Sequence, residues 1–391
     1  MDLQARRELI AGQFVSRFGC RPTVWVQAPG RVDLMGSHTD YNLGYVLTQA
    51  IDRNTWIAAR PRDDGKVAVE SLNLRGRGAF ELDGIEYDEA VPWTNYVRGV
   101  AAVLQQAGFV LQGFDGLIHS TIPFGSGLSS SAALEAAAAV LYDLLGDLNL
   151  DPVQMALLCQ HAENEFVGMN CGILDQYSST MGQPGSALLL DCRDLSSTTR
   201  PIASGIQVVI CDTRAPRALT GSEYAQRRAQ CEEGTRILAG FYPEVQALRD
   251  VGMYQLYRHA ADLSEVVYRR CRFIVEENQR VLDMAEALAR GDRREIGALT
   301  SQSYSGARDL YEIGCQEMTS MMDAMASGPG VIGARQAGAG FGGCMVAFVE
   351  ESEVGRFARH VEARYRATSG VEAQVYPVHA AAGAGKLSSR G

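Results

Sequence analysis

One segment in the first third of the chain constrains the fold more than any other. Residues 123–133 read PFGSGLSSSAA and stand between a strand-like run, Leu117–Ile122, and an Ala/Leu-rich stretch without helix breakers, Ser129–Leu145. A strand, a glycine turn and a helix N-terminus in succession make an anion site, because the first-turn N–H groups are unpaired and the helix dipole adds partial positive charge. The segment therefore predicts a phosphate-binding turn.

A helix cap is the alternative interpretation of the same residues, since a serine at a helix start needs no ligand. One serine is enough for a cap, whereas three follow one another here after a Gly-Ser-Gly-Leu turn, at Gly125, Ser126, Gly127, Leu128, Ser129, Ser130 and Ser131. We therefore favour the phosphate site. The turn lacks the Gly-Lys-Ser/Thr of a Walker A loop, so backbone and hydroxyl groups would hold a nucleotide while a metal ion and arginine neutralise its charge.

The basic residues narrow the chemistry further. Of the 36 lysines and arginines only Lys66 and Lys386 are lysines, one in a turn-like stretch and one in a Gly/Ala/Ser-rich segment. Enzymes that depend on a Schiff-base, Walker A or protein-kinase lysine are therefore poor candidates. The formal net charge of −10 argues against nucleic acid and anionic membranes as partners, because both need a basic field.

Other global features indicate a cytoplasmic protein. The nine scattered cysteines form no Cys-x-x-Cys pair, which indicates reduced thiols rather than a disulfide or zinc framework. The sequence has no run of 18 apolar residues and no leader-like pattern at its polar start.

The chain has 391 residues, too many for one ordinary hydrophobic core, so we expect two domains. Strands and helices are intermixed without strict alternation, which favours an α+β class over a doubly wound sheet. We expect domains at 1–200 and 201–379 and a flexible tail at 380–391. Expected local elements include a turn at 28–31, strands at 45–51 and 56–59, and helices at 152–167, 222–238 and 263–288.

Two further segments carry residue types suited to chemistry. In residues 161–176, Glu163 can reach a Mg²⁺ ion and Asp175 can serve as a base, although a solvated helix residue and a helix cap are the simpler interpretations of each alone. In residues 335–344, four glycines fall within six positions. Such a segment allows close backbone approach to a ligand or another loop, and a tight hairpin explains it equally well.

The phosphate turn and these two segments, in this order, resemble the three motifs of the GHMP small-molecule kinase superfamily, and within it those of the galactokinases. Residues 30–42, GRVDLMGSHTDYN, resemble the galactokinase signature, and residues 221–231 and 308–312 are galactokinase-like too. The resemblance extends from about residue 10 to residue 378. It implies a two-domain α+β GHMP kinase fold with the active site in the inter-domain cleft, and transfer of the γ-phosphoryl group of Mg·ATP to the anomeric hydroxyl of a sugar.

The resemblance also assigns catalytic and metal-binding roles. Asp175 matches the aspartate that takes the hydroxyl proton, and Arg31 matches the arginine that pairs with it, a neighbour that favours an ionised carboxylate. Ser131 and Glu163 match the Mg²⁺ ligands, whose hard oxygens suit this ion. The backbone of residues 125–130 would then cradle the phosphates.

Further matches concern the adenine and the sugar. Trp93 and Tyr96 match aromatic residues near the adenine, although core packing explains them equally well. The positions that match sugar contacts are Ser37, His38, Asp40, Gly172, Asp175 and Tyr224. Asp40 matches a carboxylate that binds two ring hydroxyls.

Ser37 is the main departure from the galactokinase pattern. Galactokinases carry glutamate there, and that carboxylate accepts a hydrogen bond from the C6 hydroxyl, whereas serine is shorter and neutral. Asp33 and Met35 instead resemble plant arabinokinases of the superfamily. We therefore expect D-galactose first, L-arabinose a close second and galacturonate third.

A catalytically silent sugar sensor is the alternative from a different class of function. The complete phosphate turn argues against it, as does the presence of both Asp175 and Arg31. The sequence does not set the oligomeric state.

Overall fold

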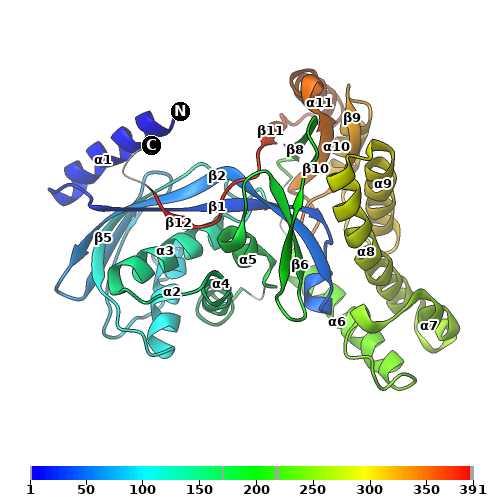
Figure 1. Cartoon of the computed structure of the whole chain (residues 1–391), viewed down its shortest axis with the longest axis horizontal. Coiled ribbons are helices and arrows are strands. Elements are labelled where there is room, and N and C mark those ends of the chain that lie inside the picture. Colours follow the sequence, from blue (N-terminus) through cyan, green and yellow to red (C-terminus); the bar gives the residue numbers. More distant parts are fainter. Residues whose placement is uncertain (1, 170, 216–219, 388–391) are drawn as a thin grey trace.

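Two long antiparallel strands run through the middle of the molecule and reach both of its halves (Figure 1). They are β1 (Val24–Met35) and β2 (Tyr45–Arg62). The structure is a computed structural model, and it describes residues 2–169, 171–215 and 220–387. The hairpin of β1 and β2 contains the segment from Gly30 to Asn42 that resembles a sugar-binding motif, so this segment reaches from the first half toward the second.

The turn expected at the Ala-Pro-Gly-Arg segment is wrong, because these residues continue β1. Pro29 pairs with Asn54 and Arg31 pairs with Ala50, so the ladder absorbs the breakers as a register shift. The two strands expected between residues 45 and 59 are likewise a single strand, β2.

The first half is built on an eight-stranded sheet. Its other strands are β3 (Lys66–Ser71), β4 (Arg77–Glu81), β5 (Gly113–Ser120), β6 (Ser186–Asp191), β7 (Ser197–Pro201) and β12 (Gly385–Lys386). The path is β12-β1-β2-β5-β3-β4, and β6 pairs with β2 and with β7. Its helical segments are α1 (Leu3–Phe18), α2 (Asn95–Gln106), α3 (Ser130–Gly146), α4 (Pro152–His161), the π-helical η3 (Ala162–Val167) and α5 (Leu174–Met181).

Helices cover both faces of this sheet (Figure 1). Side chains alternate along β2, so Trp56 and Ala58 pack in the cluster under α1 while Ile57 and Ala59 belong to the main core on the other face. Helices α2 to α5 lie on that second face. They include the start of α3 and the start of α5, where the predicted phosphate turn and Asp175 lie.

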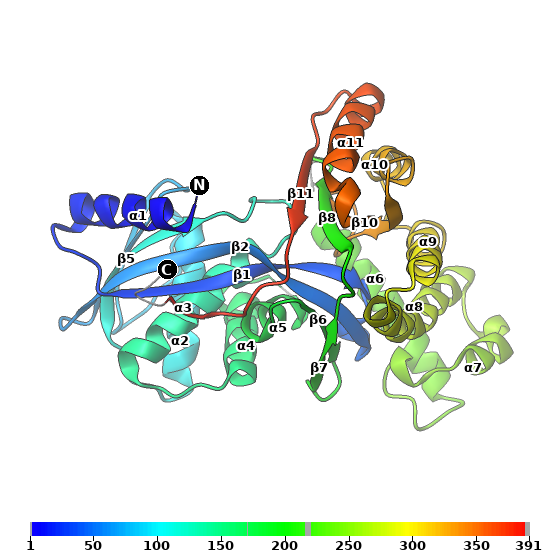
Figure 2. The same ribbon diagram turned by 45° about the horizontal axis from the view of Figure 1, so that its top comes forward.

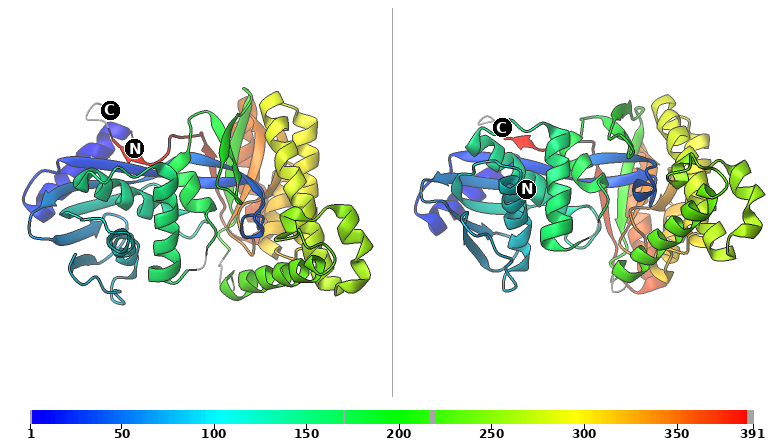
Figure 3. Two further views of the ribbon diagram at one scale, coloured as in Figure 1. Left: turned by 60° about the horizontal axis from the view of Figure 1, so that its bottom comes forward. Right: turned by 90° about the horizontal axis from the view of Figure 1, so that it is seen from below.

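The second half is built on a four-stranded antiparallel sheet with the order β11-β8-β10-β9. Its strands are β8 (Ile206–Asp212), β9 (Val331–Gln336), β10 (Cys344–Glu350) and β11 (Gln374–Val378). Its α-helices are α6 (Thr220–Ala239), α7 (Met253–Arg258), α8 (Glu265–Arg290), α9 (Arg293–Asp309), α10 (Gln316–Ala326) and α11 (Val354–Ser369). Figure 3 shows α6 beside α8 at the far end of this half.

The two halves share their largest hydrophobic core. Ile57 and Leu104 of the first half belong to the same buried cluster as Ile210, Phe348 and Met284 of the second half. A separate cluster packs α10 and α11 against the opposite face of the second sheet. The mixture of helices and sheets confirms the predicted α+β class.

The end of the described chain returns to the first sheet, so the flexible tail expected at 380–391 is wrong for residues 380–387. After β11, Ala380 forms a bridge with Ile51, and Lys386 of β12 pairs with Val26 of β1. Backbone hydrogen bonds explain this path, since the Ala381 N–H donates to a β2 carbonyl at 2.9 Å. Figure 2 shows the returning segment in red beside β1. Residues 388–391 of the expected tail lie outside the described residues.

The long helices follow the sequence pattern closely. The pattern predicts helices at 129–145, 222–238 and 263–288, and these correspond to α3, α6 and α8. Each begins and ends within two residues of its predicted bounds. None of the helices in the described part of the chain is both long and apolar enough to cross a lipid bilayer.

Candidate active site

An arginine–aspartate pair lies where β1 passes the start of α5. The Nε atom of Arg31 donates to Asp175 Oδ1 at 2.8 Å, and its Nη2 atom donates to the same oxygen at 2.5 Å. The other carboxylate oxygen, Oδ2, accepts a hydrogen bond from the Ser129 hydroxyl at 2.6 Å. The Arg31 side chain is 7% exposed and that of Asp175 is 28% exposed, so the carboxylate is oriented on both sides and still accessible.

Close packing of β1 against the phosphate turn places Arg31. A Cβ atom at Gly30 would lie 2.5 Å from the Leu128 carbonyl oxygen, so the strand can approach the turn only with glycine there. The Arg31 N–H then donates to that carbonyl at 3.2 Å, and its Nη1 atom donates to the Gly127 carbonyl at 2.6 Å. The arginine therefore connects the predicted phosphate turn to Asp175.

The backbone of the predicted phosphate turn adopts left-handed conformations at three positions. Gly125 and Gly127 have φ angles of 72° and 82°, and Ser129 has a φ of 60°. The Ser126 hydroxyl donates to the Pro123 carbonyl at 2.7 Å, which closes the turn. The Ser129 hydroxyl does not act as a helix cap. It donates to Asp175 and makes no hydrogen bond to the first turn of α3, although Ser129 is the N-cap residue.

A group of buried acidic residues lies beside this pair. Gln176 donates from Nε2 to Glu163 at 2.5 Å and to Glu135 at 3.0 Å, and the Ser131 hydroxyl also hydrogen-bonds to Glu163. Burial and then the charge of Asp175 raise the pKa of Glu163, while burial and then the charge of Glu163 raise the pKa of Glu135 well above its usual range. The carboxylates in this group therefore repel one another.

A cation fits such a group, because it would relieve the repulsion and because Mg²⁺ prefers carboxylate and hydroxyl oxygens. Within residues 2–169, 171–215 and 220–387, no three His, Cys, Asp or Glu side chains form a metal cage by themselves. Mg²⁺ commonly takes only one or two protein carboxylates together with substrate phosphates, so the oxygens of Ser131 and Glu163 fit the protein's share of such a site.

The loop between β1 and β2 brings the predicted sugar residues toward Asp175. A Cβ atom at Gly172 would lie 1.8 Å from Asp40 Oδ2, so Asp40 rests against the backbone of the loop before α5. Burial, with a further contribution from the charge of Asp175, raises the pKa of Asp40 to about 6. Burial and then the charge of Asp40 raise the pKa of Tyr224 well above its usual range, which places this phenol in the same region.

His38 is held from both ring nitrogens. Its Nε2 atom lies 2.9 Å from the Ala339 carbonyl oxygen, which can only accept, so this nitrogen carries the proton. Its Nδ1 atom then accepts from the Tyr41 hydroxyl at 2.9 Å, and Tyr41 in turn accepts from the Tyr311 hydroxyl at 2.7 Å. Burial lowers the pKa of His38 to about 4, so the ring is neutral. The backbone of His38 has a φ of 67°, in the left-handed region.

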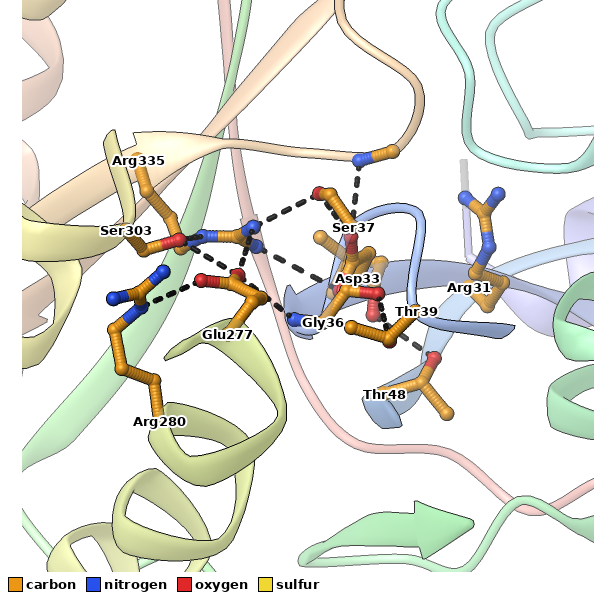
Figure 4. A network of polar contacts seen from close by, with 12 residues as sticks. Arg31, Asp33, Gly36, Ser37, Thr39, Thr48, Glu277, Arg280, Ser303 and Arg335 are labelled. Atoms are coloured by element: carbon orange, nitrogen blue, oxygen red, sulfur yellow. Dashed lines mark hydrogen bonds and ion pairs between the residues drawn. The ribbon is translucent and has the colours of Figure 1, made fainter. Parts of the chain in front are cut away.

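Ser37 is buried in a polar network between the two halves (Figure 4). Its hydroxyl donates to Asp33 Oδ2 at 2.8 Å and accepts from Arg335 Nη2 at 2.8 Å. Arg335 also contacts Glu277, whose carboxylate accepts a hydrogen bond from Arg280 at 2.7 Å. The predicted sugar contact of Ser37 therefore stays a prediction, with its one hydroxyl proton already donated to Asp33.

Three residues of these networks, Arg335, Glu277 and Gln176, have no role that the sequence motifs assign. A signal for Glu277 was present, because it stands four residues from Phe273 and from Val281 on the buried stripe of α8. Charged residues on such a stripe are buried and therefore paired. Arg335 opens the glycine-rich segment, and nothing in the sequence indicates that its partners lie near residue 37.

The glycine-rich segment is the connection between β9 and β10, as the hairpin interpretation predicts. It also approaches another loop, because Gly338 N–H donates to Asp33 Oδ2 at 3.3 Å and Ala339 accepts from His38. Gly338, with a φ of 72°, adopts the left-handed conformation that glycine allows. The segment is therefore both a hairpin connection and a place where the backbone closely approaches another loop.

Both aromatic residues predicted near the adenine are half-buried, Tyr96 in the first turn of α2 and Trp93 just before this helix. Burial and then the charge of Glu163 raise the pKa of Tyr96 to about 12, which places Tyr96 near the acidic group. The Trp93 indole N–H donates to the Arg75 carbonyl at 3.0 Å. Ser130 is half-buried at the first position of α3.

Family comparisons agree on the class of protein. Residues 12–61 match the family model described as "Galactokinase galactose-binding signature". Residues 95–183 match "GHMP kinases N terminal domain" and residues 284–367 match "GHMP kinases C terminal". These three matches cover the segments in which Arg31, Ser131, Asp175 and Arg335 lie.

Full-length relatives extend this agreement. The chain is 45% identical over 376 residues to a galactokinase of Chloroflexus aggregans (strain MD-66 / DSM 9485), and 43% identical over 375 residues to one of Roseiflexus sp. (strain RS-1). Each alignment covers 96% of this chain and 96% of the relative.

Solved structures agree as well. The crystal structure of Lactococcus lactis galactokinase complexed with galactose superposes with a TM-score of 0.93 at 34% identity, covering 98% of this chain and 100% of that chain. The Methanococcus jannaschii mevalonate kinase, at a TM-score of 0.64 and 16% identity over 93% of this chain and 100% of that one, shares the fold.

Proposed function

Since the chain belongs to the galactokinase family of the GHMP kinases, we propose that it transfers the γ-phosphoryl group of ATP to the C1 hydroxyl of D-galactose. The predicted family and two-domain GHMP fold are thereby confirmed, and the chain is a sugar kinase that uses ATP. The observation that carries the proposal is the Asp175 carboxylate, held by Arg31 and Ser129 beside the phosphate turn.

Asp175 is the proposed general base. As the C1 oxygen forms a bond to the γ-phosphorus and the bond from phosphorus to the β,γ-bridging oxygen breaks, the hydroxyl proton passes to the carboxylate, giving galactose 1-phosphate and ADP. Arg31 supports this role because its two hydrogen bonds to Oδ1 fix the carboxylate, and its guanidinium charge offsets negative charge that develops nearby.

The phosphate turn and the acidic group are the proposed nucleotide site. The backbone of residues 125–130 would hold the phosphates, and Trp93 and Tyr96 would lie near the adenine. Ser131 and Glu163 would hold Mg²⁺, which when bound neutralises phosphate charge. The repulsion that raises the pKa of Glu163 supports this assignment, because a cation would remove it.

The loop from Ser37 to Asp40 is the proposed sugar site. Asp40 would accept hydrogen bonds from two ring hydroxyls, with further contacts from the backbone of His38 and Gly172 and from the hydroxyl of Tyr224. Support comes from the packing of Asp40 on Gly172 and from the fixed ring of His38.

L-arabinose is the second candidate substrate, and Ser37 favours it. In this family the residue at this position meets the C6 hydroxyl, which L-arabinose lacks, and here the Ser37 hydroxyl is occupied by Asp33 and Arg335. Losing one hydrogen bond weakens binding by about 1–2 kcal/mol, which broadens specificity without abolishing galactose turnover.

An ADP-release assay with Mg·ATP tests the proposal by comparing kcat/KM for galactose, L-arabinose, galacturonate and glucose. A preference for galactose supports the proposal, and L-arabinose equal to or better than galactose makes the protein an arabinokinase with the same chemistry. Sugar binding without ADP release from any of the four would contradict the kinase assignment and indicate a sugar sensor.

A further inference from the structure

Arg335 is a fully buried arginine at the boundary between the two halves. From β9 its Nη2 atom donates to the Ser37 hydroxyl at 2.8 Å, and its Nε atom donates to the Ser303 hydroxyl at 3.0 Å. The same guanidinium lies 3.2 Å from Glu277 Oε1 and 3.6 Å from Asp33 Oδ1. Figure 4 shows it between α8 and α9 on one side and the end of β1 on the other.

The charges around Arg335 are balanced. Two buried arginines, Arg335 and Arg280, meet two buried carboxylates, Asp33 and Glu277, and Arg280 also contacts the partly exposed Glu276 at 3.4 Å. Charges in such a dry environment persist only when paired and hydrogen-bonded, so removal of any one leaves a buried charge without its partner. The Ser37 hydroxyl bridges the Arg335 and Asp33 side chains, which are too far apart for a direct hydrogen bond.

This network holds the loop that carries the proposed sugar residues. Glu277 Oε1 accepts from the Gly36 N–H at 3.3 Å, and Arg335 holds the next residue, Ser37. The residue after that, His38, is bonded through its ring to Ala339 on the loop that continues from Arg335. Three consecutive residues before Asp40 are thus fixed by the second half of the chain.

Backbone conformation makes this support necessary. Gly36 has a φ of 107° and His38 has a φ of 67°, and the second of these is unfavourable for a residue with a side chain. A loop with this geometry keeps it only where its surroundings fix it. The contacts from Glu277 and Arg335 act immediately before His38, and they do not reach the phosphate turn.

We propose that Arg335 is a positioning residue for the sugar: it holds the 36–40 loop so that the backbone of His38 and the carboxylate of Asp40 meet the sugar hydroxyls. This inference rests on the proposed function. Its specific consequence is that loss of Arg335 weakens sugar binding and leaves ATP binding nearly unchanged. The proposed nucleotide residues lie on or just before α2, α3 and η3, away from the Arg335 network on β9, α8 and the end of β1.

The test compares Arg335→Met with a matched control, Arg6→Met. Arg6 is another buried arginine, which donates to His119 Nδ1 at 2.9 Å and holds α1 on the opposite face of the first sheet. We expect Arg335→Met to raise the KM and the calorimetric Kd for galactose by about tenfold or more, with the KM for ATP changed by less than about twofold. Arg6→Met should lower the midpoint of urea unfolding and leave both KM values within about twofold.

Two further variants protect the test against a folding defect and a size effect. Arg335→Met/Asp33→Asn restores charge balance, because Glu277 retains Arg280. If the single variant does not fold, the double variant should fold and still show the raised galactose KM. Arg335→Lys keeps the charge but cannot reach Ser37 and Ser303 together, so we expect it to recover less than half of the lost sugar affinity on a logarithmic scale.

Equal increases in the KM for galactose and for ATP, or a loss of kcat with unchanged sugar Kd, would overturn the positioning role. So would a double variant with wild-type sugar affinity. These outcomes differ from failure of the proposed function, in which the wild-type protein itself releases no ADP with any sugar. A wild-type protein that binds galactose without turnover still allows the Arg335 test, because the calorimetric Kd is measured without catalysis.

Discussion

Arg31 and Arg335 each hold a carboxylate at the boundary between distant segments of the chain, but the two sites differ in their access to solvent. The Arg31 side chain is 7% exposed and that of its partner Asp175 is 28% exposed. Arg335 and its partner Glu277 are both 0% exposed. In the first site Ser129 and Arg31 orient a carboxylate that a substrate can still reach, whereas in the second every charge faces only other protein groups.

The difference in solvent exposure fits the role proposed for each site. A general base must contact the proton it takes, so its carboxylate has to remain accessible. A group that fixes a loop works best when water cannot compete for its hydrogen bonds, and a dry environment strengthens those bonds. The same arginine–carboxylate chemistry therefore suits both the proposed base, which stays accessible, and the proposed positioning network, which is closed to water.

The largest effect on catalysis should come from Asp175→Asn, which removes the basic oxygen while keeping the shape of the side chain. We expect kcat to fall by about a thousandfold, since a general base contributes between about a hundredfold and ten-thousandfold. The KM for galactose and the urea midpoint should change little, because the site is accessible to water. Retention of more than about a tenth of wild-type kcat would exclude Asp175 as the base.

The network of Arg335, Glu277, Arg280 and Asp33, called the sealed site below because all four side chains are buried, should instead affect stability when it is disrupted. Glu277→Gln leaves Arg335 with one carboxylate, that of Asp33 at 3.6 Å, and leaves Arg280 with the partly exposed Glu276 at 3.4 Å. We expect the free energy of unfolding to fall by about 3 kcal/mol, measured by urea denaturation, since breaking a buried ion pair from one side leaves an uncompensated charge. An exposed pair such as Arg228–Glu232 provides the control, and Glu232→Gln should cost less than about 1 kcal/mol.

These two sites also differ in how far the sequence predicts them. Arg31, Ser129 and Asp175 lie in short segments whose glycines and serines by themselves indicate a site. Their contacts agree with the pairing that the resemblance implies for Arg31 and Asp175. The bond from Ser129 to Asp175 could not be predicted in this way, because a serine at this position is equally suited to a phosphate or a cap.

The sealed site could not be predicted, because its four charged residues lie on three separate elements. Arg335 and Asp33 are about 300 residues apart in the chain, and they meet only because β9 approaches the end of β1 in the folded structure. Local pattern does predict the long helices, whereas it fails at the bulge in β1 and at the return of residues 380–387 to the first sheet. Both failures concern backbone pairing with a distant strand, which a local pattern does not contain.

A smaller catalytic effect is expected from Ser129→Ala, which removes the hydrogen bond to Asp175 Oδ2 at 2.6 Å. A hydrogen bond to a charged group contributes about 1.5–3 kcal/mol, so kcat should fall by roughly tenfold or more while the KM for ATP stays within about twofold. Single-turnover kinetics at saturating ATP measure this directly. An increased KM for ATP with unchanged kcat would instead assign the hydroxyl to the nucleotide.

Acid pH should separate two buried carboxylates that lie near the 36–40 loop but have different partners. Burial raises the pKa of Asp40 to about 6. Burial alone would also raise the pKa of Glu277, but Arg280 and Arg335 outweigh it, so its pKa lies below the usual value. Between pH 7 and pH 5, Asp40 therefore takes up a proton while Glu277 stays ionised.

We expect galactose affinity, measured by calorimetry without nucleotide, to weaken by about tenfold from pH 7 to pH 5, because a protonated Asp40 accepts fewer hydrogen bonds. Folding stability should not fall over this range through either group. The folded state gains a proton at Asp40 that the unfolded state binds only near pH 4, and the stability from Glu277 is lost only below its unfolded pKa of about 4.3. The Asp40→Asn variant should show no such pH dependence, and an unchanged profile would contradict the role of Asp40.

The smallest expected effect also decides between two roles of Ser37, which are holding the 36–40 loop and contacting the sugar. Ser37→Ala removes the bridge between Arg335 and Asp33, but Arg335 keeps its contacts with Ser303 and Glu277. We therefore expect the KM for galactose and for L-arabinose to rise together by about three- to fivefold, a cost near 1 kcal/mol. Steady-state kinetics with both sugars measure the ratio of their kcat/KM values, which should stay within about twofold of wild type.

A change in that ratio would place Ser37 at the sugar instead. L-arabinose lacks C6, so a serine that contacts the C6 hydroxyl would affect galactose and leave L-arabinose unchanged. Thr39→Ser serves as the control, because the Thr39 hydroxyl bonds to the Gly36 and Tyr45 carbonyls at 2.6 Å and serine preserves both bonds. An equal decrease in kcat/KM for the two sugars would mean that Ser37 acts through the position of the loop. A side chain that contacts only the C6 hydroxyl cannot affect the binding of a sugar that lacks C6.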